Sequence, residues 1–286
     1  MATIHSRVAA AADLLRRSGV PGDDAGLEAR LLAQHVLGWN AVRFLADARR
    51  ADSPDFASRF DALIDRRSRR EPLAYITGER DFWKLTFDVS PAVLIPRPET
   101  EHIVEAALVA FPDATAPIHV ADVCTGSGCV GIAIAHERPL VSVIATDISD
   151  AALDVARRNV TRYALADRVR LLRADLLNGV EKGLDLIVAN PPYVPAGDRE
   201  TLAPEVRDYE PALALFADSD GLAVIRRLVA EAPTYLAPGG ALIFEFGYGE
   251  AEAVADLIGT TPGLTMSRVV NDLQGIPRVA VSVHES

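Results

Sequence analysis

The sequence has few residues that could form a covalent or metal-based scaffold. Among 286 residues it contains two cysteines, Cys124 and Cys129, with no Cys-x-x-Cys pair and no histidine cluster beside them. This spacing excludes a disulfide framework and a structural zinc site, and it is typical of a protein in a reducing compartment. We therefore expect no bound metal and a cytoplasmic location.

Long apolar runs are also lacking. No stretch approaches 18 uninterrupted apolar residues, which excludes a membrane-spanning helix. The first twelve residues contain one arginine and no apolar core of signal-peptide length, so no secretory signal is expected.

Basic residues are outnumbered: 29 Lys and Arg stand against 40 Asp and Glu, a formal net charge of −11. Proteins that wrap duplex nucleic acid usually carry the opposite sign, so direct DNA binding is not expected. Residues 1–80 nevertheless contain 13 arginines against 11 acids. For the cluster at the end of this region, a solvated helix end is favoured over docking of an acidic or polyanionic partner. The cluster comprises Arg66, Arg67, Arg69 and Arg70.

The apolar pattern divides the chain into three parts. Residues 1–75 show helical spacing without strand-like alternation, which predicts a small helical bundle. Residues 76–95 contain Phe82, Leu85 and Phe87 at mostly alternating positions, which predicts a β-hairpin connector. Residues 96–286 form the remaining, larger domain.

In the larger domain, strand-like runs alternate with helical segments. Strands are expected at 118–123, 141–145, 169–172, 184–189, 241–246, 264–270 and 278–283. Helices are expected at 130–135, 149–160, 222–230 and 251–258. This alternation predicts an α/β fold with a mostly parallel, seven-stranded sheet covered by helices on both faces. The last two strands are joined by a short turn and should be antiparallel partners at an edge.

A glycine-rich segment follows the first of these strands. Gly126-Ser127-Gly128-Cys129-Val130-Gly131 matches G-x-G-x-x-G, in which the backbone and the helix amides approach a ligand closely. Asp147 ends the next strand, where an acid can accept hydrogen bonds from both hydroxyls of a ribose. The alternative role for Asp147 is to cap the following helix. The pattern predicts an adenosine-type cofactor, either NAD or S-adenosylmethionine.

Two further acids favour S-adenosylmethionine. Asp122 precedes the glycine loop, where it could contact the methionine ammonium group or, equally, anchor the loop. Asp175, at the end of the third strand, could reach the adenine amino group. The lack of G-x-x-x-x-G-K-[ST] argues against ATP on a phosphate loop.

Asn190-Pro191-Pro192-Tyr193 follows the fourth strand, at the sheet edge where ligands bind. A planar NH2 group has a delocalised lone pair and attacks a sulfonium methyl poorly. The carbonyls of an asparagine and a proline can each accept one of its N–H bonds, which fixes the nitrogen and stabilises its developing positive charge. The prolines stiffen the loop, and Tyr193 offers a flat face to a planar substrate group. The structural alternative is a strand terminator.

Together these motifs resemble those of Rossmann-like class I amino-group methyltransferases. With the helical N-terminal region and the segment Ile95-Pro96-Arg97-Pro98-Glu99-Thr100-Glu101, the whole chain resembles the protein-(glutamine-N5) methyltransferases of the PrmC/HemK family. The resemblance implies methyl transfer from S-adenosylmethionine, leaving S-adenosylhomocysteine, to the glutamine of the Gly-Gly-Gln motif in peptide chain release factors. The N-terminal domain (residues 1–75) would help to hold the factor, and the enzyme is expected to be a monomer.

The resemblance also implies which residues form the site. Cofactor contacts are expected at Cys124, Thr125, Gly126, Ser127, Gly128, Asp147, Asp175, Leu176 and Asn190. Catalytic and substrate contacts are expected at Asn190, Pro191, Pro192 and Tyr193. One departure from the family pattern is Cys124, which stands where many relatives have the first glycine of the loop.

Two other enzyme classes share parts of the pattern. An NAD dehydrogenase would leave Asn190 to Tyr193 without a role. A methyltransferase acting on adenine N6 or guanine N2 of nucleic acid would use the same tetrapeptide, but it should present a basic surface with aromatic residues. Residues 81–286 instead hold 16 of the 29 basic residues and 29 of the 40 acidic ones.

Overall fold

The structure is a computed structural model that describes residues 2–285. It divides into two compact units. One comprises Met1–Glu79 with Ala203–Tyr209, and the other comprises Arg80–Leu202 with Glu210–Ser286. Each unit has its own hydrophobic core, so each is described separately.

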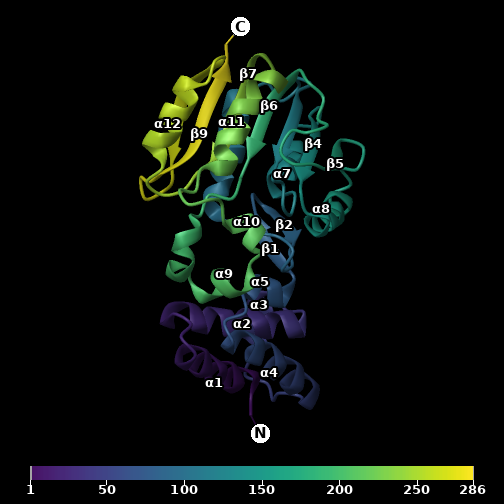
Figure 1. Ribbon diagram of the computed structural model, residues 1–286. Helices are drawn as coiled ribbons and strands as arrows, with labels where there is room; N and C mark the ends of the chain where they lie inside the picture. Colours follow the sequence, from purple (N-terminus) through teal and green to yellow (C-terminus); the bar gives the residue numbers. More distant parts are fainter. Residues whose placement is uncertain (1, 286) are drawn as a thin grey trace. The chain divides into compact units, whose positions relative to one another are not determined.

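The first unit consists of helices (Figure 1), and those before residue 80 enclose one apolar core. The helices of this unit are α1 (Ile4–Arg17), α2 (Gly22–Leu37), α3 (Ala41–Asp47), α4 (Pro54–Ser68), α5 (Leu73–Thr77) and α9 (Pro204–Tyr209). Their ends follow local signals: the Ser53 hydroxyl accepts the amide of Phe56 at the start of α4, and left-handed Gly38 ends α2. The N-terminal helical bundle expected from the sequence is confirmed. Helix α9 was not expected.

The arginine cluster at the end of α4 is paired within this unit. The side chain of Arg67 is only 4% exposed, and its guanidinium binds Glu28 at 2.7 Å and Glu205 of α9 at 2.9 Å. Arg70 also binds Glu205, at 2.6 Å. The remaining pairs are Arg66 with Glu71 and Arg69 with Asp65. The prediction of a solvated helix end is therefore wrong for Arg67, which is buried and pairs with one acid of α2 and one of α9.

The expected hairpin is confirmed, although it is shorter than residues 76–95. Strands β1 (Glu79–Phe82) and β2 (Leu85–Asp88) form a two-stranded sheet. Trp83 and Lys84 between them both have positive φ, as a tight two-residue hairpin turn requires.

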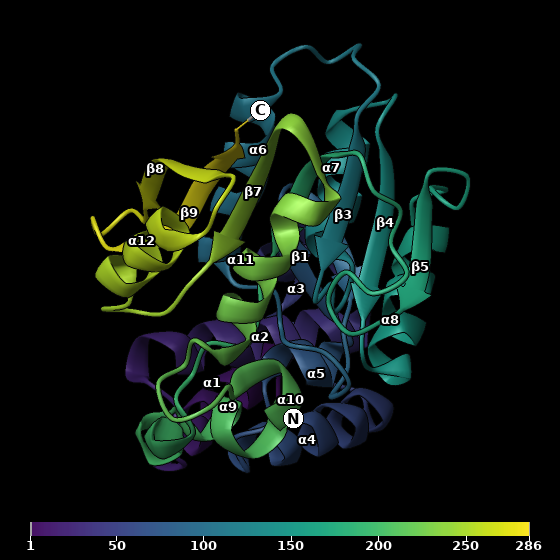
Figure 2. The same cartoon turned by 45° about the horizontal axis from the view of Figure 1, so that its top comes forward.

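A seven-stranded sheet forms the centre of the second unit (Figure 2). Its strands are β3 (His119–Val123), β4 (Ser142–Asp147), β5 (Val169–Arg173), β6 (Leu184–Ala189), β7 (Leu236–Glu245), β8 (Leu264–Asn271) and β9 (Pro277–His284). They lie in the order β5-β4-β3-β6-β7-β9-β8, and β9 is antiparallel to both β7 and β8. The mostly parallel α/β sheet and its antiparallel edge pair are confirmed.

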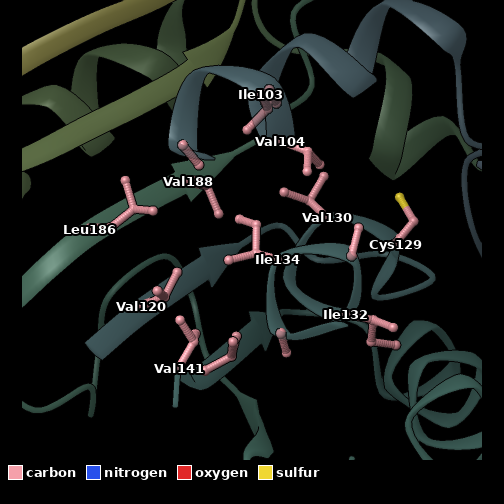
Figure 3. Packing of buried hydrophobic residues seen from close by; sticks show 14 of the residues in the cluster. Ile103, Val104, Val120, Cys129, Val130, Ile132, Ile134, Val141, Leu186 and Val188 are labelled. Atoms are coloured by element: carbon pink, nitrogen blue, oxygen red, sulfur yellow. The ribbon is translucent and has the colours of Figure 1, made fainter. Parts of the chain in front are cut away.

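Helices cover both faces of this sheet. The longer ones are α6 (Glu101–Ala110), α7 (Cys129–Glu137) and α8 (Asp150–Arg162) on one side, and α11 (Ala223–Tyr235) and α12 (Ala251–Thr260) on the other. Val120 and Val188 pack with residues of α6 and α7 (Figure 3), whereas their neighbours Ala121 and Ile187 belong to the opposite core. The central strands are apolar on both faces for this reason. Short helical segments connect the rest: η1 (Pro98–Thr100), η2 (Ala196–Thr201) and α10 (Ala212–Leu215).

Strand β7 begins earlier than the sequence pattern predicts. Leu236 already pairs with Leu184, and the register shifts before Ala241 pairs with Leu186. The Pro238-Gly239-Gly240 segment, which precedes the strand expected at 241–246, is thus an irregular part of β7. A Cβ atom on Gly240 would lie 2.9 Å from the backbone oxygen of Leu184, so only glycine fits against the neighbouring strand.

Candidate active site

The predicted site residues meet where the order of the parallel strands reverses. Val123 at the end of β3 lies opposite Thr146 of β4 on one side and Ala189 of β6 on the other. The segments that follow these strands therefore emerge next to one another at the carboxyl edge (Figure 2). A reversal of this kind opens a crevice in an α/β sheet.

A cavity of about 280 Å³ occupies this edge of the second unit. The predicted residues that line it are Cys124, Thr125, Gly126, Ser127, Asp147, Asp175, Leu176, Asn190 and Pro192. Gly128, Pro191 and Tyr193 are neighbours of lining residues in the sequence but are not themselves part of the described lining. The structure thus brings four separate segments, which follow β3, β4, β5 and β6, to one cavity.

The glycine loop turns through left-handed backbone conformations. Cys124, Gly126 and Gly128 have φ values of 58°, 55° and 81°. Glycine adopts such angles without strain, whereas a side chain at Cys124 disfavours them. The departure from the family pattern at Cys124 therefore falls at a position whose backbone favours glycine.

Asp122 anchors this loop. Its Oδ2 accepts hydrogen bonds from the Thr125 hydroxyl at 2.5 Å and from the Gly131 amide at 3.0 Å. A Cβ atom on Gly131 would lie 2.8 Å from the same oxygen, which explains the last glycine of the motif. Burial raises the pKa of Asp122 to about 6. The anchoring role is confirmed, and because Asp122 also lines the cavity, contact with an ammonium group stays a prediction.

Asp147 links two loops at the cavity wall. Its Oδ1 accepts the Ser149 amide at 2.9 Å, and its Oδ2 accepts the Gly126 amide at 3.0 Å. Helix α8 is capped by the Ser149 hydroxyl, which accepts the amide of Ala152. The alternative in which Asp147 caps the helix is therefore wrong. Burial raises the pKa of Asp147.

Asp175 is paired across the cavity lining. Its carboxylate binds Arg227 of α11 at 2.8 Å, and both residues line the cavity. Leu176 beside it has φ of 51° and is buried. Sequence reasoning missed Arg227, because an arginine on a helix has no pattern of its own that marks it as a cavity residue.

A chain of hydrogen bonds orients the Asn190 side chain. Its Nδ2 donates to Thr100 Oγ1 at 3.0 Å, and the Thr100 hydroxyl donates to Glu245 Oε2 at 2.7 Å. The Tyr193 hydroxyl donates to Glu245 Oε1 at 2.8 Å. Burial raises the pKa of the Glu245 carboxyl and that of the Tyr193 phenol. Sequence reasoning missed Thr100 and Glu245, although a lone acid at the end of the apolar β7 run was a signal.

Comparisons with known proteins show the family of this chain. Residues 8–78 match the PrmC N-terminal domain family, and residues 105–205 match the methyltransferase small domain family. The release factor glutamine methyltransferase of Cereibacter sphaeroides is 41% identical, over 94% of each chain. That of Burkholderia pseudomallei is 44% identical, over 90% of each chain. The chain belongs to the release factor glutamine methyltransferase family.

The fold of this family member is shared more widely. A methyltransferase from Pyrococcus furiosus is 20% identical and aligns with a TM-score of 0.55, over 78% of this chain and 99% of its own. At that identity the likeness concerns the fold alone. It supports the class I Rossmann-like assignment.

The proline-rich segment of this methyltransferase also holds neighbouring segments in place. Arg97 pairs with the buried Glu210, which also accepts the amide of Ile95 at 3.1 Å. Glu101 accepts the amide of Trp83 in the hairpin turn at 2.9 Å. The segment therefore places Thr100 beside Asn190 through several independent anchors.

Other reactive groups of this family member are few. Within residues 2–285, no three His, Cys, Asp or Glu side chains are grouped so as to hold a metal ion. Both cysteines are free thiols, and burial raises the pKa of Cys124 and raises that of Cys129 to about 12.

No helix in the described part of the chain has the length and apolar character needed to cross a membrane.

Proposed function

We propose that this chain transfers a methyl group from S-adenosylmethionine to the side-chain amide nitrogen of a glutamine in peptide chain release factors. Family membership, at 41% identity over 94% of each chain, supports this reaction class. The observation that carries the proposal is Asn190 at the cavity, with its NH2 group engaged by Thr100. Its carbonyl oxygen is then left to accept an N–H bond of the substrate. By the resemblance stated above, the target is the glutamine of the Gly-Gly-Gln motif.

The cavity lining fits the cofactor. We assign Asp147 to the ribose hydroxyls, because a half-buried carboxylate at the end of β4 can accept two hydrogen bonds. Asp122 would meet the methionine ammonium group, and Asp175 the adenine amino group, with the loop Cys124–Gly128 approaching the ligand through its backbone. When bound, the cofactor supplies a sulfonium-activated methyl group.

The residues of the chain then act on the substrate nitrogen. The Asn190 side-chain carbonyl and the Pro191 backbone carbonyl each accept one N–H of the glutamine amide, which holds its nitrogen in line with the methyl carbon. As the N–C bond forms and the C–S bond breaks, the nitrogen gains positive charge, and both hydrogen bonds strengthen. The methylated nitrogen then loses one proton to water.

The alternative of nucleic-acid base methylation has less support. It requires the same tetrapeptide, but the relatives that span the chain are named for release factor glutamine methylation. The formal net charge of −11 also opposes binding to a phosphate backbone.

We assign release factor docking to the helical unit, residues 1–75 of the sequence. Residues 8–78 match the PrmC N-terminal domain family, and these helices enclose a core of their own. They are therefore able to present a stable surface to a protein partner.

Transfer of labelled methyl from S-adenosylmethionine tests the proposal. A release factor should be labelled, whereas a factor with Gln→Ala in its Gly-Gly-Gln motif and duplex DNA should not be. Asn190→Ala should lower the single-turnover rate by about 100-fold or more, because a desolvated acceptor is lost from the charge-developing nitrogen. Cofactor affinity should change much less. Label found only in DNA, or a near-wild-type rate for Asn190→Ala, would contradict the proposal.

A further inference from the structure

We propose that Glu245 is a positioning residue: through Thr100 it determines which end of the Asn190 amide faces the substrate. This inference rests on the proposed function, since it concerns the acceptor that function requires. It adds two residues from segments distant in sequence, η1 and the end of β7, to the machinery of methyl transfer.

Thr100 and Glu245 form the buried centre of a hydrogen-bonded chain that runs from Asn190 to Tyr193. Thr100 and Glu245 are 2% and 1% exposed, so water does not compete for their hydrogen bonds. Each Glu245 oxygen receives one O–H donor, from Thr100 at 2.7 Å and from Tyr193 at 2.8 Å. Both donors therefore hold the carboxylate in one orientation.

The direction of these bonds fixes the amide of Asn190. A carboxylate accepts hydrogen bonds, so the single proton of the Thr100 hydroxyl points to Glu245. The Thr100 oxygen then has only lone pairs to offer Asn190, which must present its NH2 group at 3.0 Å. The side-chain carbonyl faces away from Thr100 as a result.

The opposite orientation would oppose the reaction. A turned Asn190 amide would place its carbonyl against the lone pairs of Thr100 and its N–H bonds against those of the substrate nitrogen. Two donors facing each other repel, and the repulsion grows as the nitrogen becomes positive. The acceptor-only character of Glu245 thus excludes the unproductive orientation.

Substitutions at Thr100 test this without altering the acceptor itself. Thr100→Val keeps the shape of the side chain and removes the hydroxyl. The hydrogen bond that fixes the orientation of the Asn190 amide is then lost. We expect the single-turnover rate at saturating cofactor to fall about 10- to 100-fold, with the KM for the release factor and the Kd for S-adenosylmethionine changed less than about threefold. Thr100→Ser, which restores the hydroxyl and lacks the methyl group, should recover a rate within about threefold of wild type.

A double-mutant cycle tests the role of Glu245. Glu245→Leu should lower the rate, and adding Thr100→Val to it should cause little further loss, because both act on one orientation. Multiplicative losses would show that Glu245 does not act through Thr100 and would overturn that part of the inference. If Glu245→Leu fails to fold, the Thr100 variants still decide, because Ser losing as much as Val, or Val retaining the full rate, contradicts positioning by the hydroxyl.

The two proposals fail in different ways. A wild-type enzyme that does not label the release factor contradicts the proposed function and removes this inference with it. A wild-type enzyme that labels the factor, beside an unimpaired Thr100→Val variant, contradicts only the positioning role.

Discussion

Gly221 lies where any side chain would displace a catalytic segment. Gly221 has φ of 79°, and a Cβ atom there would overlap the backbone oxygen of Tyr193 and the side-chain oxygen Oε1 of Glu250. Gly239 has nearly the same φ, 80°, but nothing lies within 4 Å of its Cβ position. Substitutions at both positions therefore introduce the same backbone strain, and only the one at Gly221 also displaces neighbouring atoms, which include the loop that follows β6.

We predict that Gly221→Ala lowers turnover by about tenfold or more, because even a small displacement of Asn190 to Tyr193 misaligns the acceptors. Gly239→Ala carries the same left-handed strain and should leave single-turnover rates near wild type. In both variants the Kd for S-adenosylmethionine, measured by calorimetry, should change much less than the turnover of Gly221→Ala. Equal losses in the two variants would mean that strain, rather than contact with Tyr193, limits Gly221.

Cofactor binding should release protons near pH 6. Burial raises the pKa of Asp122 to about 6, so at pH 6 about half of the Asp122 carboxyl groups are protonated before the cofactor binds. A nearby ammonium group favours the carboxylate and lowers this pKa, so binding should release up to about half a proton at pH 6 and about a tenth at pH 7. Calorimetry in buffers of different ionisation enthalpy measures this release.

The matched control for this release is Asp154→Asn, which removes an exposed carboxylate of α8 that does not line the cavity and should retain it. Asp122→Asn should abolish it. Release that persists without the Asp122 carboxyl would show that the ammonium group binds elsewhere.

Among the residues that line the cavity, sequence reasoning named those that lie in contiguous motifs. The loop Cys124–Gly128, Asp147 and Asn190 were recognisable because a tight turn, a strand end and a short tetrapeptide are each encoded locally. Thr100, Glu245 and Arg227 were not identified. Each acquires its place through a contact with a segment far away in sequence, such as the 145 residues that separate Thr100 from Glu245.

Among the structural elements, α9 shows most clearly how a short helix depends on distant partners. It spans Pro204–Tyr209, which is too short to be stable alone or to show a helical period. Its Glu205 accepts hydrogen bonds from both Arg67 and Arg70, and the Tyr209 hydroxyl donates to the backbone oxygen of Arg69. The end of α4 therefore holds this helix in place.

Glu205→Gln should destabilise the helical unit by about 1–3 kcal/mol, because the buried Arg67 loses one of two charged partners. Asp65→Asn is the matched control. It removes a partner of Arg69 from a pair whose side chains are both well exposed, so the expected change is below about 1 kcal/mol. Chemical denaturation followed by circular dichroism compares them, and equal effects would contradict the special role of α9.

The long, periodic elements were predictable in a way that α9 was not. Seven strands and the helices between them follow from runs of apolar residues whose period reports local conformation. The early start of β7 escaped prediction because Pro238-Gly239-Gly240 reads as a turn, while pairing of Leu236 with Leu184 is a tertiary contact. Tertiary pairing outweighed local preference there.

At the scale of the whole molecule, the chain passes between its two units three times, at residues 79–80, 202–203 and 209–210. The helical unit is therefore discontinuous in sequence. Its first five helices lie before residue 80, and its last helix follows four of the seven strands of the large sheet.

This order has a consequence during synthesis on the ribosome. Arg67 precedes Glu205 by 138 residues, so at about 5–20 residues per second it waits roughly 7–28 s for that partner. A nascent chain arrested before residue 203 should be cleaved by protease within residues 1–79 faster than one arrested after residue 240. Equal cleavage rates would mean that the early helices mature unaided. Faster cleavage of the shorter chain would mean that this enzyme completes its N-terminal unit only late in its own synthesis.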